Sequence, residues 1–186
     1  MVCFLRVISG KRRGLKLESL PGTDTRPTLD RVKEAIFSML FDRCDNAKAL
    51  DLFAGSGSMG IEVLSRGGKS CTFVDFSKDA VEIVKSNIKK ADFEKVSTII
   101  YTAFDEYLSK CDEKFDLIFL DPPYSSGYTE KALDIIYKRE LLAPDGIVVS
   151  ESDRDNVPSY SENYSVIKQK NYGRVNVCLL EALWKK

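Results

Sequence analysis

The chain of 186 residues has 28 basic and 28 acidic side chains, with 44% hydrophobic and 30% charged residues. This balance is typical of a globular protein with one full hydrophobic core and excludes a largely disordered chain. The absence of histidine excludes Ser-His-Asp hydrolysis, histidine acid–base catalysis and histidine-ligated metals, so we expect no metal site. The five cysteines are scattered and include no Cys-x-x-Cys pair, which is typical of reduced thiols. With no stretch of membrane-spanning length and no signal-peptide pattern, a cytoplasmic protein is expected.

The N-terminal segment carries an excess of positive charge. Residues 1–33 hold eight basic and three acidic side chains, which leaves +5 there and −5 on the rest of the chain. Two short apolar runs, residues 5–8 and 15–17, flank a polar stretch and predict a hairpin with a basic tip. We expect residues 1–27 to form a basic hairpin extension within a single domain, 1–186, that binds a polyanion; a solvated basic loop is the plain alternative. The candidate RNA-binding residues are Lys11, Arg12, Arg13 and Arg26.

Helical and strand-like segments alternate along the rest of the chain. Thr28 is the predicted N-cap of the first helix, whose apolar residues recur at helical spacing as far as Leu40. The predicted strands are residues 49–53, 71–75, 96–101, 115–120 and 147–151, and the clearest helices between them are residues 57–66, 77–91 and 129–138. Two final apolar segments, 164–169 and 175–183, predict a closing antiparallel hairpin. The pattern predicts a doubly wound, Rossmann-like α/β fold with a mostly parallel, seven-stranded sheet.

A glycine-rich loop joins the first of these strands to the helix after it. Gly55, Gly57 and Gly60 satisfy the G-x-G-x-x-G pattern, in which glycine keeps the strand–helix turn tight and admits a nucleotide close to the backbone. Asp51, at the end of the strand, would repel the pyrophosphate of a dinucleotide but would attract an ammonium group. The methionine part of S-adenosylmethionine (SAM) carries such a group, so the loop predicts SAM rather than NAD.

Asp75 ends the second predicted strand, about twenty residues after the first glycine of the loop. A carboxylate at this position commonly holds ribose hydroxyls. The simpler alternative is an acidic residue favoured near the N-terminus of the helix that follows. Because Asp75 is in register with the glycine loop, we expect it to bind the ribose of SAM.

The tetrapeptide Asp121-Pro122-Pro123-Tyr124 follows the apolar run Phe115–Leu120. The Asp121 carboxylate and the Pro122 carbonyl can each accept a hydrogen bond from an exocyclic amino group, and a base can stack on Tyr124. An ordinary turn is the alternative, since proline is common in loops. Because the carboxyl ends of parallel strands meet at one edge of a sheet, we expect this tetrapeptide to lie beside the glycine loop. Such a site would methylate the amino group of a nucleobase.

Together with the N-terminal phrases, these motifs resemble the bacterial small-subunit (16S) ribosomal RNA guanine-N2 methyltransferases, the RsmD-like family. The resemblance extends over nearly the whole chain and rests on residues 6–14, 26–37, 50–60, 115–124 and 172–173. It implies a class I SAM-dependent fold, SAM as cofactor, and methylation of the exocyclic N2 amine of a guanine in small-subunit rRNA. The catalytic residues would be Asp121, Pro122 and Tyr124. The cofactor-binding residues would be Asp51, Phe53, Gly55, Ser56, Gly57, Gly60, Asp75, Phe76, Phe104 and Asp121.

One position departs from the family pattern. Relatives often place an acid after the third strand, where it contacts the adenine amino group, but this chain has Ala103 there and Asp105 two residues on. Either Asp105 takes over this contact, or backbone amide and apolar contacts hold the adenine.

Three other functions fit part of the sequence. A DNA adenine-N6 methyltransferase uses the same tetrapeptide but normally needs a sizeable target-recognition domain. A non-catalytic RNA-binding protein with a methyltransferase fold would have no use for an intact set of motifs. An NAD-dependent oxidoreductase fits the glycines but not Asp51. We therefore expect an enzyme, sufficient as a monomer, that acts on ribosomal RNA in the small subunit or an assembly intermediate.

Overall fold

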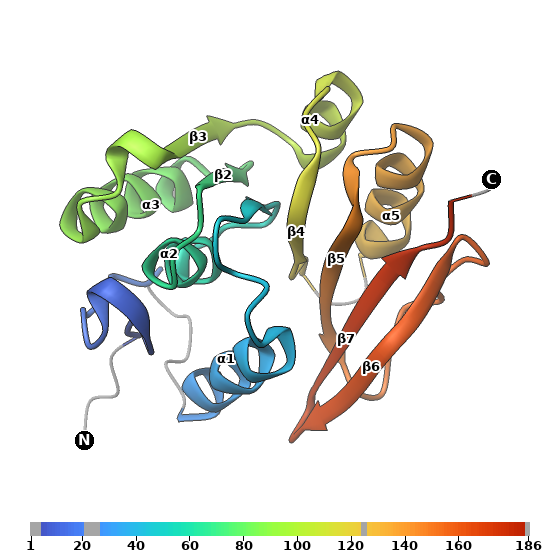
Figure 1. The fold of residues 1–186 in the computed structure, drawn as a ribbon, viewed down its shortest axis with the longest axis horizontal. Helices are drawn as coiled ribbons and strands as arrows, with labels where there is room; N and C mark the ends of the chain where they lie inside the picture. The colour runs from blue at the N-terminus through green and yellow to red at the C-terminus, as the bar shows by residue number, and fades with distance from the viewer. Residues whose placement is uncertain (1–4, 21–26, 124–125, 185–186) are drawn as a thin grey trace.

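A seven-stranded sheet in the order β3-β2-β1-β4-β5-β7-β6 forms the centre of the molecule (Figure 1). The computed structural model describes residues 5–20, 27–123 and 126–184. Strands β1 to β5 run parallel, whereas β7 is antiparallel to both β5 and β6. The strands are β1 (Lys48–Asp51), β2 (Ser70–Asp75), β3 (Ser97–Tyr101), β4 (Phe115–Leu120), β5 (Leu142–Asp153), β6 (Tyr164–Tyr172) and β7 (Val175–Ala182). The predicted doubly wound fold and its closing hairpin are confirmed.

Helices connect the parallel strands and cover the sheet. Those that were predicted between strands begin and end within one residue of the predicted bounds. The helices are α1 (Pro27–Leu40), α2 (Ser58–Ser65), α3 (Lys78–Ala91), α4 (Phe104–Lys110) and α5 (Tyr128–Lys138). Helix α4 was not predicted, because its seven residues are too few to show a clear helical periodicity.

Two boundaries differ from the prediction for identifiable reasons. Helix α1 begins at Pro27, so Thr28 lies in the first turn and is not the N-cap. Proline suits this position because the first N–H groups of a helix have no partner within it. Strand β5 begins at Leu142, before its predicted start, because the pairing with β4 changes register between Phe115 and Leu117 and continues through a turn-like segment.

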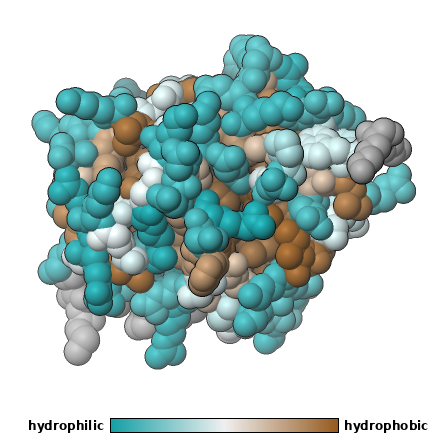
Figure 2. All heavy atoms as spheres, viewed as in Figure 1, coloured by the Kyte–Doolittle hydropathy of each residue, from teal (hydrophilic) through white to brown (hydrophobic). Residues whose placement is uncertain are grey.

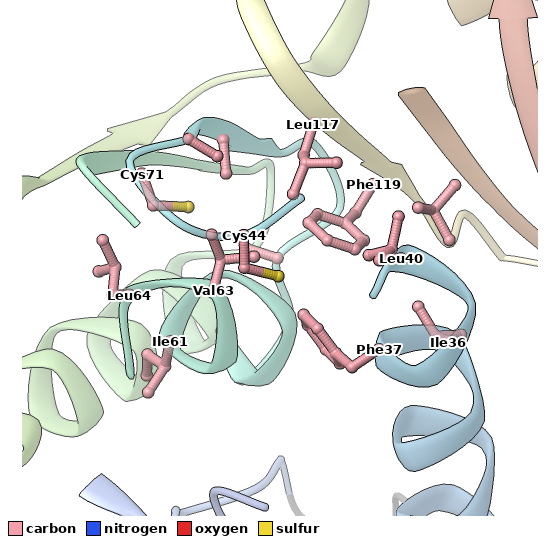
Figure 3. Close-up of a cluster of buried hydrophobic side chains, with 14 of the residues drawn as sticks. Ile36, Phe37, Leu40, Cys44, Ile61, Val63, Leu64, Cys71, Leu117 and Phe119 are labelled. Carbon is pink, nitrogen blue, oxygen red and sulfur yellow. The ribbon is translucent and has the colours of Figure 1, made fainter. Parts of the chain in front are cut away.

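Apolar side chains cover both faces of the sheet. On β4, Leu117 and Phe119 belong to the layer that includes α1 and α2, while Ile118 and Leu120 belong to the layer of α4 and α5. Burial on both faces explains why this strand is an almost unbroken apolar run. In the first layer, Phe37 of α1 packs against Phe119 with ring centroids 6.0 Å apart (Figure 3).

The outside of the molecule differs from these layers. Hydrophilic side chains predominate on the face in Figure 2, and apolar residues lie between them in small groups. Within the described part of the chain, no helix is both long and apolar enough to cross a membrane. The described cysteines are buried free thiols, in agreement with the predicted reduced state; they are Cys44, Cys71, Cys111 and Cys178.

Strands β1 and β4 are neighbours at the centre of the sheet. Asp51 pairs with Phe119, and the Leu52 N–H donates to the Phe119 carbonyl at 3.2 Å. The glycine loop after β1 and the Asp-Pro-Pro segment after β4 therefore emerge beside each other at the C-terminal edge of the sheet. This confirms the juxtaposition predicted from the two motifs.

Candidate active site

The glycine loop has a shape that other residues would not allow. Gly55 and Gly57 have φ angles of +55° and +75°, in the left-handed region that favours glycine. A Cβ added at Gly60 would lie 2.3 Å from Cε1 of Phe73, so glycine lets α2 pack directly on β2. A Cβ added at Gly55 would meet only the Phe53 carbonyl oxygen, at 4.0 Å. The backbone at Gly55 therefore borders open space in which a ligand can approach closely.

Asp75 holds the loop from the end of β2. Its two carboxylate oxygens accept hydrogen bonds from the N–H groups of Gly55 and Ser77, each at 2.8 Å. Ser77 is the N-cap of α3, so Asp75 also stabilises the helix start, as the simpler interpretation of this residue predicted. Each oxygen keeps a second lone pair that can accept from a ribose hydroxyl. The adjacent Phe76 is 63% exposed and offers a free aromatic face beside that position.

Asp51 is buried at the end of β1 and has little compensation for its charge. It is 4% exposed, and its Oδ2 atom accepts a hydrogen bond from the Gly60 N–H at 3.1 Å. Desolvation raises the pKa of Asp51 to about 7, and repulsion from Asp121 and Asp75 contributes in the same direction. A bound cation would stabilise the carboxylate here, so the position fits the ammonium group predicted for it.

Asp121 and Pro122 follow β4 directly. The Asp121 side chain reaches solvent, yet the protein around its carboxyl group removes enough water to raise its pKa to about 6. Pro122 is buried. Tyr124 and Arg26 lie outside the described residues, so the predicted stacking and phosphate contacts of these two remain predictions.

The predicted cofactor residues Phe53 and Phe104 belong to a group of three aromatic rings. Their centroids lie 5.1 Å apart, and Tyr128 of α5 stacks 6.4 Å from Phe53. The side chain of Phe104 is mostly buried, whereas Phe53 and Tyr128 are partly accessible. Asp105 pairs with Lys131 at 2.6 Å, and this hydrogen bond lowers the pKa of Asp105. Asp105 is thus already engaged, which favours the alternative in which backbone and apolar contacts hold the adenine.

Sequence reasoning did not single out Tyr128 and Glu151, which the structure places beside the predicted site residues. Tyr128 gave no distinctive signal, since it is one aromatic residue at the start of a helix. Glu151 lies on β5 beside the Asp-Pro-Pro segment, and a signal for it was present. It is an acid at the end of a predicted parallel strand, the same feature that singled out Asp51, Asp75 and Asp121.

The N-terminal segment forms the predicted hairpin. The Val7 N–H donates to the Leu15 carbonyl at 2.9 Å, and the tip contains a short 3-10 turn, η1 (Gly10–Arg12). This turn packs on the C-terminal end of α2, where a Cβ at Gly10 would lie 1.9 Å from the Ser65 carbonyl oxygen. Because α2 has eight residues, the tip lies about 12 Å along the helix from the glycine loop.

The basic residues of the tip have different surroundings. The Arg12 guanidinium lies 2.7 Å from the Asp92 carboxylate and 5.8 Å from the Phe93 ring centroid, so it anchors the hairpin to the end of α3. Lys11 and Arg13 are exposed, and neither forms an ion pair within the described residues. RNA binding by Lys11 and Arg13 remains a prediction, while the contacts of Arg12 give it a structural role.

The sheet order and the glycine loop at its C-terminal edge define a Rossmann-like fold of the SAM-dependent methyltransferase class. A solved structure agrees: yhhF of Escherichia coli, provisionally named a methyltransferase, is 28% identical with a TM-score of 0.86, and the match covers 96% of this chain and 98% of that one. The chain belongs to the family described as Conserved hypothetical protein 95, which matches residues 5–181, and the resemblance to the RsmD-like family is confirmed.

Curated relatives match over almost their whole length. YlbH of Bacillus subtilis (strain 168), provisionally named an rRNA methyltransferase, is 39% identical over 98% of this chain and 99% of its own. Ribosomal RNA small subunit methyltransferase D of Haemophilus influenzae is 34% identical over 95% of this chain and 93% of its own. The similarity therefore includes both the N-terminal extension and the edge of the sheet that carries Asp51 and Asp121.

Proposed function

We propose that this chain transfers the methyl group of SAM to the exocyclic N2 amine of a guanine in small-subunit ribosomal RNA. The observation that carries the proposal is the pairing of β1 with β4, which brings the glycine loop beside Asp121 and Pro122. Relatives named as small-subunit rRNA methyltransferases support ribosomal RNA as the substrate.

The residues at the strand ends fit SAM. When bound, SAM supplies an electrophilic methyl group on a sulfonium centre. The buried carboxylate of Asp51 would hold the ammonium group, since among the described residues it accepts a single hydrogen bond, from Gly60. Asp75 would accept from the ribose hydroxyls, and the exposed ring of Phe76 would stack on the adenine. The open space beside Gly55 leaves room for the chain between them.

Asp121 and Pro122 would position the amine that accepts the methyl group. The lone pair of a guanine amine is delocalised into the ring, which makes the nitrogen a poor nucleophile. Hydrogen bonds from its two N–H groups to the Asp121 carboxylate and the Pro122 carbonyl would favour a tetrahedral nitrogen with a localised lone pair. The Asp121 charge would also stabilise the positive charge that develops on the nitrogen. As the N–C bond forms, the C–S bond of SAM breaks to leave S-adenosylhomocysteine, and the methylated nitrogen would lose one proton to Asp121 or to water. Positioning of this kind contributes on the order of 10 kcal/mol, so no covalent enzyme intermediate is required.

The target guanine must leave its base stack to reach this edge. A base paired within a helix presents its amine to its partner strand, whereas an unpaired base in a loop can be splayed out at low cost. Phosphates next to the target would lie near positive charge, and we propose that Lys11 and Arg13 hold some of them.

The test is to identify the methylated nucleoside directly. The purified chain is incubated with isotopically labelled SAM and, separately, with small-subunit rRNA, unmodified small subunits, adenine-containing DNA and a protein mixture. We expect label in N2-methylguanosine from the ribosomal substrates, detected by mass spectrometry after nuclease digestion. Label in N6-methyladenine of DNA would replace the proposal with the adenine alternative. Binding of SAM without transfer to any substrate would indicate a non-catalytic RNA-binding protein.

A further inference from the structure

Glu151 is an acid at the strand edge that the mechanism above does not use. Leu120, the last residue of β4, pairs with Ser150 of the parallel strand β5, so Asp121, directly after β4, lies next to Glu151 of β5. The pairing of β4 with both β1 and β5 puts the ends of these three strands side by side. Burial raises the pKa of Glu151, and repulsion from Asp121 and Asp51 raises it further, in agreement with that arrangement. Within the described residues, no cation contributes to the environment of any of the three.

Glu151 also lines a small pocket beside the proline pair. The pocket has a volume of about 50 Å³, and Pro122, Ser152 and Asn156 contribute to its wall. The Ser152 hydroxyl is buried (5% exposed) and has no hydrogen-bond partner among the described residues. Buried polar groups normally have partners, so Ser152 marks a place on β5 where the described residues do not satisfy every polar group.

The neighbours of the reactive amine differ between the nucleobases. In guanine, the N2 amine lies beside N1–H, which is a hydrogen-bond donor. In adenine and cytosine, the exocyclic amine lies beside a ring nitrogen that is an acceptor. An oxygen acceptor placed next to Asp121 therefore favours guanine and opposes the other two bases, because it would face a lone pair in each of them.

We propose that Glu151 accepts a hydrogen bond from N1–H of the target guanine while Asp121 and the Pro122 carbonyl accept from its N2 amine. Glu151 is then the residue that makes the enzyme specific for guanine, an inference that rests on the proposed function. The donors of one base edge would also relieve the repulsion between Asp121 and Glu151, because hydrogen bonds to a carboxylate stabilise its charged form.

The experiment tests the proposed hydrogen bond between Glu151 and N1–H of guanine by changing first the base and then the residue. The modified guanine is first mapped by mass spectrometry, and small-subunit rRNA is then ligated with guanine or 2-aminopurine at that position and reconstituted with small-subunit proteins. 2-Aminopurine keeps the N2 amine but has an acceptor at N1. We expect the wild-type enzyme to prefer guanine by about 10- to 100-fold in kcat/KM. In Glu151→Gln, whose amide can turn its NH₂ group toward N1, this preference should fall to nearly onefold.

Two measurements keep the outcome interpretable. Glu151→Gln should bind S-adenosylhomocysteine like the wild type, and Glu130→Gln, a change to another acid near the same pocket, should keep the wild-type preference for guanine. If Glu151→Gln keeps the wild-type preference for guanine over 2-aminopurine, or no longer binds S-adenosylhomocysteine, the role assigned to Glu151 is wrong. The proposed methyltransferase function would still stand. If the wild-type enzyme forms no N2-methylguanosine on any ribosomal substrate, the proposed function itself fails.

Discussion

Glu62 and Asp51 are both buried carboxylates, but the protein surrounds them in opposite ways. Glu62 is 0% exposed, accepts hydrogen bonds from two backbone N–H groups of the hairpin and from Arg66, and lies 3.4 Å from the Lys33 ammonium. Asp51 is 4% exposed and accepts one hydrogen bond, from the Gly60 N–H, with other carboxyl groups as its charged neighbours.

This difference indicates that Glu62 has a structural role, as the joint between three segments of the chain, whereas Asp51 belongs to a binding site. Glu62 connects the N-terminal hairpin, α1 and α2, and its charge is neutralised by cations of the chain itself. Asp51 is buried without such a partner in the part of the chain that the structure describes, which costs stability in the absence of a ligand. The site at Asp51 therefore suits a ligand that carries a positive charge and hydrogen-bond donors, which the described residues around it do not supply. The comparison leads to opposite predictions for removing the two charges.

The largest effect is expected from breaking the joint at Glu62. Glu62→Ala leaves the buried Lys33 ammonium without the carboxylate that pairs with it, although it still donates to the Arg6 carbonyl, and removes the acceptor of the hairpin N–H groups. We expect a loss of about 3–5 kcal/mol in the free energy of unfolding, measured by urea denaturation. The matched control is Glu82→Ala on the exposed side of α3, which should leave the denaturation midpoint unchanged. A midpoint shift as small as the control's would show that the joint does not stabilise the fold.

Asp121→Ala should instead affect chemistry without affecting the fold. Loss of the carboxylate removes one of the two acceptors that orient the amine, and such groups contribute about 10²–10³-fold in rate. We expect the single-turnover rate of transfer to ribosomal substrate to fall by that factor. The affinity for S-adenosylhomocysteine, measured by calorimetry, should remain close to wild type. Loss of cofactor binding would mean that the predicted contact of Asp121 with the cofactor, and not its contact with the amine, is the important one.

Asp51→Asn should stabilise the ligand-free protein at neutral and higher pH. The folded-state pKa of Asp51, about 7, lies above its ordinary value of 3.8. The stability from this group is therefore fully present below pH 3.8 and is lost as pH rises through about 7. We expect the substitution to add about 1–3 kcal/mol to the free energy of unfolding at pH 8 and little at pH 4, measured by urea denaturation without cofactor.

The same variant should bind S-adenosylhomocysteine more weakly, because the partner of the ammonium group is lost. Opposite changes in stability and affinity are the signature of a binding carboxylate. If Asp51→Asn destabilises the chain as Glu62→Ala does, the Asp51 carboxylate stabilises the fold, and the conclusion that it is a ligand-binding carboxylate is wrong.

The features that the sequence predicted well are local in the chain. The strand β4 follows from an apolar run, and the glycine loop follows from steric needs that only glycine meets at Gly57 and Gly60. Neighbouring parallel strands then place Asp51, Asp75 and Asp121 at one edge without further information.

The features that the sequence did not predict depend on contacts between distant segments. Arg12 pairs with Asp92, 80 residues away, so nothing in the basic tip distinguishes an anchoring arginine from an RNA-binding one. The same holds for Glu62, whose partners come from the hairpin and α1. Glu151 gained its significance only when β5 was found beside β4.

The smallest effect is expected at the hairpin tip, where the charges of Lys11 and Arg13 are exposed and form no ion pair with the described residues. Lys11→Ala combined with Arg13→Ala should weaken RNA binding and lower the slope of log affinity against log salt by about 1–2. Filter binding at several salt concentrations measures both quantities. Arg12 stays unchanged in this variant, because its removal would loosen the hairpin from α3 and confuse folding with binding.

The control for the hairpin prediction is Lys168→Ala with Lys170→Ala, which removes two exposed charges from the edge strand β6. Both double variants lose the same net charge, so a general electrostatic effect would weaken RNA binding equally in the two. If the hairpin contacts RNA directly, the loss of RNA affinity should be larger in the Lys11 and Arg13 variant than in the Lys168 and Lys170 variant. Equal losses would show that RNA binding depends only on the net charge of the protein. The hairpin would then have a structural role, as Glu62 does, and no specific role in RNA binding.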